Sequence, residues 1–383
     1  MEEIISRLQI EPFLYHPIFM YGLCALAIIY IIYLSSINAN SRNVLAQGSS
    51  IYPATALTAV VIIFIGFRPV SVFFGDMTMY AHYYNNILGE VYEIDTDVNT
   101  HSEWLWEYAM QAFKFLGMTD VMFFAFCALI YVGCMYWACY RIMPRHLLPA
   151  MLFCLCAFSF WGYAVNGIRN GVGSSIALVA LTYMLGGKRE KIIAAILFFL
   201  TLGIHRSLLL PAACAVASAF FIKKPKTAIY IWIASIAFSL LFGNAIADIF
   251  AALGFDDRMN DYLRAGVDDE AMEEFSDTGF RWDFLLYSAI PIWLMWYVSI
   301  KRRLRSKTYE FLASTYIFAN AFWILVIRSS FSNRFAYLSW FIYPLVIAYP
   351  LLEMKIWKRQ HLKLALALLA YEAFTFVMFL LGK

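Results

Sequence analysis

The sequence predicts an all-α, polytopic integral membrane protein with about 12 transmembrane helices. Hydrophobic residues make up 62% of its 383 residues and charged residues only 14%, whereas about a quarter of a soluble domain is charged. The apolar residues form continuous runs, and a helix needs about 20 such residues to cross a bilayer. Because the runs are continuous rather than alternating, they favour membrane helices over a barrel.

The apolar runs divide the chain, residues 1–383, into one transmembrane domain with two long hydrophilic loops, 68–120 and 253–283. We expect spans at residues 17–35, 51–66, 121–140, 147–164, 171–185, 192–204, 208–221, 228–250, 284–300, 311–327, 335–352 and 364–381. All seven cysteines fall inside these spans, which is typical of small buried apolar residues. The segment before the first span is only 16 residues long and acidic, so we expect no cleavable signal peptide.

The distribution of charge predicts the orientation. Lysine and arginine on short loops mark the cytoplasmic side. When successive loops are assigned alternately to the two sides of the membrane, most of the 29 basic residues fall on one side and most of the 26 acids on the other. The acids concentrate in the two long loops. We therefore expect both long loops and both termini on the periplasmic side.

A polar break interrupts the apolar stretch 192–221. A single helix there would place the basic clusters 188–191 and 223–226 on opposite sides of the membrane. A break at His205, Arg206 and Ser207 returns both clusters to the cytoplasm. Each half is only about 20 Å long, so we expect the turn to lie below the outer surface, surrounded by protein or water.

Helical spacing also appears in the first long loop. One face of a helix carries Glu103, Glu107, Gln111 and Lys114, and the other carries Trp104, Leu105, Tyr108, Ala112 and Phe115. This pattern predicts a helix lying in the membrane interface. Upstream, Asp76, Tyr80 and Tyr83 are also helically spaced. In the second loop the acids between 268 and 274 fit either a segment that folds over a substrate or a solvated linker.

Charged residues at membrane depth are costly and therefore indicate function. On the predicted topology they lie at the outer ends of spans: Arg68, Arg169 beside Asn166, His205, Arg206, Arg328 and Arg334. Arginine suits the capture of a diphosphate, and histidine accepts a proton near neutral pH. For Arg68 and Arg328 the alternative is a side chain that only reaches the interface. Asp76 is a second possible base or a helix cap.

No glycine-rich phosphate loop, zinc motif or Ser-His-Asp set appears, so we expect no cofactor and no metal. Instead, Arg169-Asn170-Gly171 opening a span, followed by Gly203-Ile204-His205-Arg206-Ser207-Leu208, resembles the Arg-Gln-Gly … Phe-His-x-Ser-Ala pattern of EpsG-like proteins. These belong to the Wzy-type bacterial polysaccharide polymerases. Asp76 with Tyr80, Glu107, and Arg334 with Tyr337 also resemble that family. The chain departs from the pattern at Asn170 and Ile204.

The resemblance implies a GT-C-like membrane glycosyltransferase of the bacterial inner membrane with its active site facing the periplasm. It would transfer a growing glycan from undecaprenyl diphosphate to a lipid-linked oligosaccharide repeat, making O-antigen, capsule or exopolysaccharide. A chain-length regulator and a flippase would be partners. Arg169, Arg206 and Arg334 would stabilise the diphosphate, and His205 or Asp76 would act as base. Further substrate contacts would come from Arg68, Arg328, Tyr80, Glu107 and Tyr337.

Three other functions are compatible with the sequence. A polyprenyl-linked single-sugar transferase usually carries acids after its first span, where this chain enters the cytoplasm. A polysaccharide O-acyltransferase would share a buried histidine and arginines, but would take its acyl donor from the cytoplasm. A lipid-linked oligosaccharide flippase should show related halves and charges along a central path. No internal repeat is visible and the two long outer loops fit an enzyme better than a transporter, so the flippase is disfavoured and the polymerase is preferred.

Overall fold

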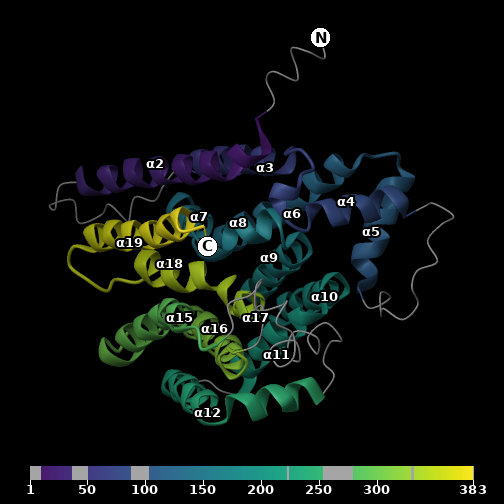
Figure 1. The fold of residues 1–383 in the computed structure, drawn as a ribbon. Helices are drawn as coiled ribbons and strands as arrows, with labels where there is room; N and C mark the ends of the chain where they lie inside the picture. The colour runs from purple at the N-terminus through teal and green to yellow at the C-terminus, as the bar shows by residue number, and fades with distance from the viewer. Residues whose placement is uncertain are drawn as a thin grey trace. The chain divides into compact units, whose positions relative to one another are not determined.

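The computed structural model describes residues 10–36, 51–87, 103–221, 224–252, 279–328 and 332–382. Every regular element in these ranges is a helix, which confirms the predicted all-α class for the described part of the chain. The chain divides into two compact units. The first comprises Met1–Leu208 and Leu351–Lys383, and the second comprises Leu209–Pro350 (Figure 1).

Several helices are long and apolar enough to cross a membrane, as expected for a polytopic membrane protein. In the described residues six such spans occur, or seven if one bent helix pair counts as a span. The six are Pro12–Ser36, Asp120–Ile142, Pro225–Gly243, Trp282–Lys301, Ser332–Glu353 and Gln360–Leu380. Ile51–Gly66 and Arg206–Phe220 are shorter apolar helices. The count of 12 spans stays a prediction.

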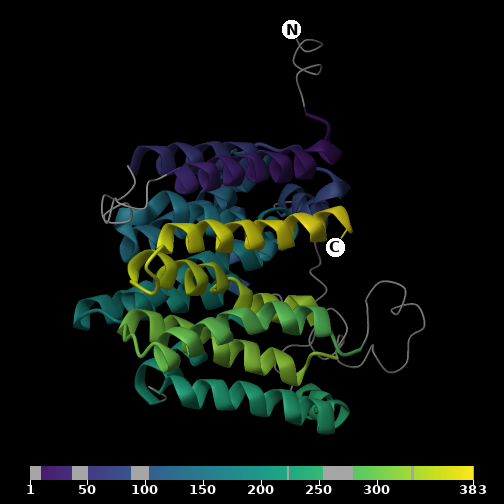
Figure 2. The same ribbon diagram turned by 90° about the vertical axis from the view of Figure 1, so that its left-hand side faces the viewer.

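The first unit is built around α9, whose small buried residues allow close packing. α9 contacts both α6 and α10, α3 packs on α6, and α2 lies along α19 (Figures 1 and 2). The elements of this unit are η1 (Pro12–Leu14), α2 (Tyr15–Ser36), α3 (Ile51–Gly66), η2 (Val72–Phe74), α4 (Met77–Asn86), α5 (Trp104–Phe115), α6 (Asp120–Ile142), η4 (Pro144–His146), α7 (Leu147–Leu155), α8 (Phe158–Val165), α9 (Ile168–Tyr183), α10 (Lys188–Ile204), η5 (Arg206–Leu208) and α19 (Gln360–Leu380).

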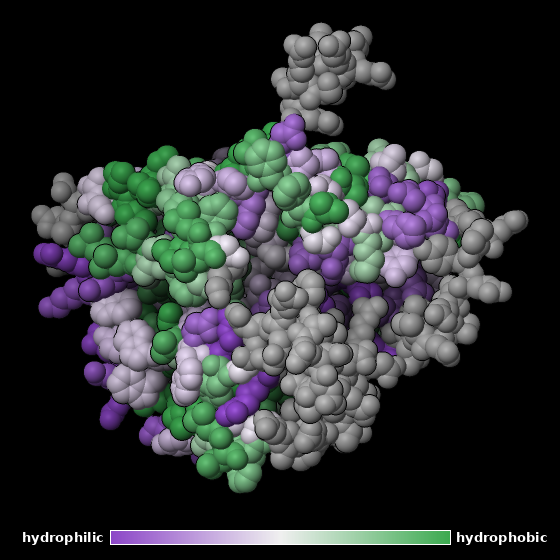
Figure 3. All heavy atoms as spheres, in the orientation of Figure 1, coloured by the Kyte–Doolittle hydropathy of each residue, from purple (hydrophilic) through white to green (hydrophobic). Residues whose placement is uncertain are grey.

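The outward side of α2 is apolar. Ile29 and Ile32 are 63% and 62% exposed, and hydrophobic side chains gather over this helix in Figure 3. An exposed aliphatic face along one helix fits contact with lipid.

The second unit packs around α16. This helix contacts α11, α12, α15 and α17. The elements are α11 (Leu209–Val216), the π-helix η6 (Ala217–Phe221), α12 (Pro225–Ala252), α15 (Trp282–Met295), the π-helix η7 (Trp296–Lys301), α16 (Lys307–Leu325), α17 (Ser332–Trp340) and most of α18 (Tyr343–Glu353).

One buried polar side chain of this second unit, Asn320, is paired on both sides. The Asn320 side chain accepts a hydrogen bond from Trp232 Nε1 at 2.8 Å and donates one to Ser339 Oγ at 3.0 Å. Because unpaired polar groups are costly in an apolar core, this asparagine ties α12 and α17 to α16.

Two predicted features of the helices can be compared with the structure. The predicted span 147–164 consists of two helices, α7 and α8, which meet at 74° and together still qualify as one candidate span. The carbonyl of Cys156, at the bend, accepts a hydrogen bond from Thr375 Oγ1 at 2.7 Å. The predicted break near His205 is confirmed: α10 ends at Ile204 and His205 has extended backbone angles.

The structure confirms helices inside the first long loop. They are α4, which follows Asp76, and α5, which follows Glu103, and the place of α5 in the membrane interface stays a prediction. The acidic run 268–274 lies outside the described residues.

Candidate functional site

Three helix ends of the first unit bring charged side chains together. Glu103 precedes α5, Arg169 lies in the first turn of α9, and His205 follows α10. The Glu103 carboxylate forms an ion pair with the Arg169 guanidinium through Oε2 and Nη1. Its other oxygen, Oε1, lies 3.7 Å from His205 Nδ1. The three side chains are 13–19% exposed, so the cluster is only partly shielded from water.

Small residues allow these helix ends to meet. Gly203, in the last turn of α10, faces the start of α5: a Cβ atom there would lie 2.7 Å from Trp104 Cε2 and 2.9 Å from Leu105 Cβ. The Trp104 ring also packs against Phe199 of α10, with 5.9 Å between ring centroids. Glycine at position 203 therefore allows Glu103 to reach the end of α10.

The His205 ring is oriented by the turn that follows it. Nδ1 accepts a hydrogen bond from the backbone N–H of Ser207 at 3.3 Å, and it lies 2.8 Å from Ser207 Oγ. Since a backbone N–H only donates, this geometry assigns the proton of the neutral ring to Nε2. His205 is thus set to donate a hydrogen bond through Nε2.

Tyr80 and Glu107 lie beside the cluster. Arg169 Cζ lies 5.8 Å from the centroid of the Tyr80 ring, a distance that suits a cation–π contact. Tyr80 is 6% exposed and packs edge-on against Trp106 of α5. Glu107 is half-buried in the first turn of α5, one turn beyond Glu103. The structure therefore gathers four elements, α4, α5, α9 and α10, at one place.

Asp76 is fixed near this place by its backbone. It occupies the N-cap position of α4, but its side chain does not cap the helix. Its N–H instead donates to Asn166 Oδ1 at 2.9 Å, and Asn166 lies between the end of α8 and the start of α9. Gly75 permits this contact because it has a φ of +61° and because a Cβ atom would lie 2.3 Å from Asn166 Oδ1.

Arg68 is in the protein interior, with 1% of its surface exposed. It donates hydrogen bonds to the carbonyls of Ile65 at 2.6 Å and Val165 at 3.4 Å, and its Cζ lies 5.4 Å from the Phe74 ring centroid. Burial lowers the pKa of Arg68 to about 10, so it stays charged at neutral pH. These contacts support a role in joining the ends of α3 and α8, and its predicted contact with substrate stays a prediction.

The other predicted residues are Arg206 and three residues of the second unit. Arg206 directly follows His205 and is exposed on η5. In the second unit Arg328 is exposed and lies 5.9 Å from the Phe280 ring centroid. Arg334 is exposed on α17, and Tyr337 packs against Trp340 with 5.5 Å between ring centroids. Their predicted convergence with Arg169 and His205 stays a prediction.

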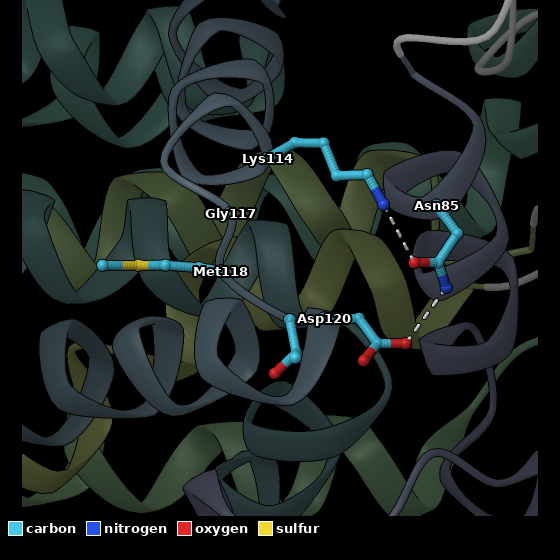
Figure 4. Close-up of a pocket in the computed structure, with 6 residues that line it drawn as sticks. Asn85, Lys114, Gly117, Met118 and Asp120 are labelled. Atoms are coloured by element: carbon cyan, nitrogen blue, oxygen red, sulfur yellow. Dashed lines mark hydrogen bonds between the residues drawn. The ribbon is translucent and has the colours of Figure 1, made fainter.

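A separate surface pocket lies at the other end of α5. Lys114 Nζ donates to Asn85 Oδ1 at 3.4 Å, and Asn85 Nδ2 donates to Asp120 Oδ2 at 3.2 Å (Figure 4). Its lining is polar and carries both signs of charge, and it does not include the Glu103 cluster. In the described ranges no group of three or more histidine, cysteine or acidic side chains could hold a metal ion.

Comparison with known proteins agrees with the resemblance seen in the sequence. The model of the EpsG family matches residues 51–382, a range that contains every residue of the cluster. No curated protein and no solved structure matches the chain.

Proposed function

Since the chain belongs to the EpsG family, we propose that it is a membrane glycosyltransferase that polymerises a bacterial surface polysaccharide. Its donor is a growing glycan on undecaprenyl diphosphate, and its acceptor is a hydroxyl of a lipid-linked oligosaccharide repeat. The reaction takes place at the periplasmic face of the inner membrane, on a GT-C-like scaffold of about 12 spans with both termini in the periplasm. A flippase supplies the repeats, and a chain-length regulator is a partner.

The observation that carries this proposal is the meeting of Arg169 and His205 beside the Glu103 carboxylate. When the glycan leaves its lipid carrier, negative charge develops on the diphosphate. Such a reaction needs cationic stabilisation of the leaving group and a base near the acceptor hydroxyl. A partly shielded arginine stabilises the leaving group more strongly, because water screens its positive charge less.

We assign the roles as follows. Arg169 binds the diphosphate, with Arg206 and Arg334 contributing further positive charge. His205, whose Nδ1 accepts from Ser207, donates its Nε2–H to a phosphate oxygen. The proton of the acceptor hydroxyl then goes to a carboxylate, for which Asp76 is the candidate named by sequence. Tyr80, Glu107 and Tyr337 supply surfaces and hydrogen bonds for sugars.

The proposal is tested in the native host by deleting the gene and measuring the length distribution of the surface glycan. Complementation uses the wild type, Arg169→Ala and the matched control Arg141→Ala, because Arg141 also pairs with a glutamate, Glu190 at 2.6 Å. We expect a collapse to one repeat in the deletion strain, restored by wild type and Arg141→Ala but not by Arg169→Ala.

The same experiment distinguishes the alternatives. An unchanged ladder that lacks only a sugar or an acyl group would identify a modifying transferase. Loss of lipid-linked repeats from the periplasmic face would identify a flippase. Either result would contradict polymerisation.

A further inference from the structure

We propose that Glu103 is the general base of the reaction, and that binding of the donor diphosphate activates it by drawing Arg169 away. This inference rests on the proposed polymerase function and adds a catalytic residue to it. The motifs that resemble the EpsG family include Glu107, one turn further along α5, but not Glu103.

The position of Glu103 is unusual for a residue that begins a helix. An acid at the N-cap normally accepts hydrogen bonds from the first turn, but the Glu103 side chain makes no capping bond. Its Oε2 pairs with the Arg169 guanidinium of α9, and its Oε1 lies 3.7 Å from His205 Nδ1 at the end of α10. With 15% of the side chain exposed, the carboxylate can still meet a substrate hydroxyl.

The ion pair provides the coupling between donor binding and base strength. A diphosphate carries more negative charge than a carboxylate and offers the bidentate oxygens that a guanidinium prefers. Donor binding therefore competes with Glu103 for Arg169. A carboxylate that loses a neighbouring cation accepts a proton more readily, so Glu103 becomes an effective base only when the leaving group is in place.

The chemical step balances without another reactant. Glu103 takes the proton from the acceptor hydroxyl as its oxygen attacks the anomeric carbon of the donor sugar. The bond from that carbon to the diphosphate oxygen breaks, and its electron pair leaves on the lipid diphosphate, held by Arg169. The proton then passes from Glu103 to the departing diphosphate or to water.

Geometry favours Glu103 over the other two candidate bases. His205 Nδ1 already accepts from Ser207, and the tautomer this implies carries a proton on Nε2. Asp76 bonds to Asn166 only through its backbone N–H, and none of the described contacts brings its carboxylate to Arg169. The Glu103 carboxylate, in contrast, contacts Arg169 itself, the group assigned to the leaving diphosphate.

The test uses the full-length chain purified in lipid nanodiscs. The substrate is the lipid-linked repeat extracted from the gene-deletion strain, and inorganic pyrophosphate is a competing anion. In Glu103→Gln, which keeps the shape but removes the charge, we expect kcat to fall about 10²- to 10⁴-fold. The inhibition constant of pyrophosphate should fall about tenfold, because the competing carboxylate beside Arg169 is gone. Glu190→Gln, which breaks the matched pair with Arg141, should change neither value.

The two readouts separate a base from a structural residue. Loss of rate together with weaker pyrophosphate inhibition would mean that Glu103 only supports Arg169, and this would overturn the proposal. An unchanged kcat would also overturn it. If Glu103→Gln folds poorly, Glu103→Asp replaces it in the test. This variant keeps a carboxylate with shorter reach and should retain part of the rate. If the wild type itself forms no polymer, the proposed function fails, whatever the variants do.

Discussion

The carboxylate of Glu103 and the guanidinium of Arg169 form an ion pair across 66 residues of sequence. This pair joins the start of α5 to the start of α9 and lies beside His205. A buried or partly buried pair of this kind is weak support for stability, since desolvation offsets much of its attraction. Its position beside His205 and the Tyr80 ring, where three helix ends meet, therefore favours a functional explanation.

Arg169→Lys tests whether the cluster needs a guanidinium or only a positive charge. Lysine keeps the charge but loses the planar, bidentate contact with phosphate oxygens. We expect polymer formation to fall by about one to two orders of magnitude, roughly 1.4 to 2.7 kcal/mol of transition-state stabilisation. The measurement is polymer formed per amount of inserted protein. Activity equal to wild type would remove bidentate binding from the mechanism.

Gly75→Ala tests the link between Asp76 and the start of α9. Gly75 has φ +61° and ψ −123°, a sparsely populated conformation that costs a non-glycine residue about 1–3 kcal/mol, and an alanine Cβ would also meet Asn166 Oδ1 at 2.3 Å. Gly117→Ala controls for the positive φ, because Gly117 has a φ of +73° with nothing within 4 Å of a Cβ atom. In detergent, Gly75→Ala should lower the thermal midpoint more than Gly117→Ala. Equal midpoints would argue against the close approach of Asn166.

Asn320→Leu tests the polar pairing inside the second unit. The substitution leaves the Trp232 indole N–H and the Ser339 hydroxyl without this partner, so we expect a loss of about 1–3 kcal/mol of stability. In a Trp232→Phe background the indole donor is already absent. The added cost of Asn320→Leu should then be smaller by about 0.5–2 kcal/mol. Strict additivity of the two thermal shifts would show that the hydrogen bond is not formed.

Ser207→Cys tests the predicted orientation of the His205 turn. In a background without the seven native cysteines, a membrane-impermeant maleimide added from outside should label this half-buried position slowly. Lys358→Cys, an exposed position in a predicted cytoplasmic loop, should react only after the membrane is opened. If the thiol introduced in place of Ser207 reacts only from the cytoplasmic side, the predicted topology is inverted.

Much of the helical architecture could be predicted from local patterns. The continuous apolar run of α3 and the amphipathic spacing of α5 predict those helices, because periodicity is a local property. The break at His205 was predictable because basic clusters flank the apolar stretch 192–221. Both clusters can lie on the cytoplasmic side only if the stretch turns back. The bend between α7 and α8 was not, since Thr375, which hydrogen-bonds the Cys156 carbonyl, is far away in sequence.

The site was predictable only in part for the same reason. Arg169 and His205 stand out as charges in apolar surroundings, and the structure brings them together. Glu103 does not stand out, because an acid on the polar face of an amphipathic helix is usually solvated. Its significance depends on contacts with α9 and α10, which no local pattern specifies. Arg68 shows the converse, since a conspicuous charge lies in the interior and bonds to backbone carbonyls.

If this chain alone links lipid-borne repeats to one another, reconstitution with purified components should show the linkage. The purified full-length protein in lipid nanodiscs is supplied with the lipid-linked repeat, and the products are resolved by length. We predict a ladder of two, three and more repeats on a single lipid carrier, with one lipid diphosphate released for each linkage formed, and no ladder with Arg169→Ala. A product that gains only one sugar or one acyl group, or repeats that cross the bilayer without any new linkage, would contradict it.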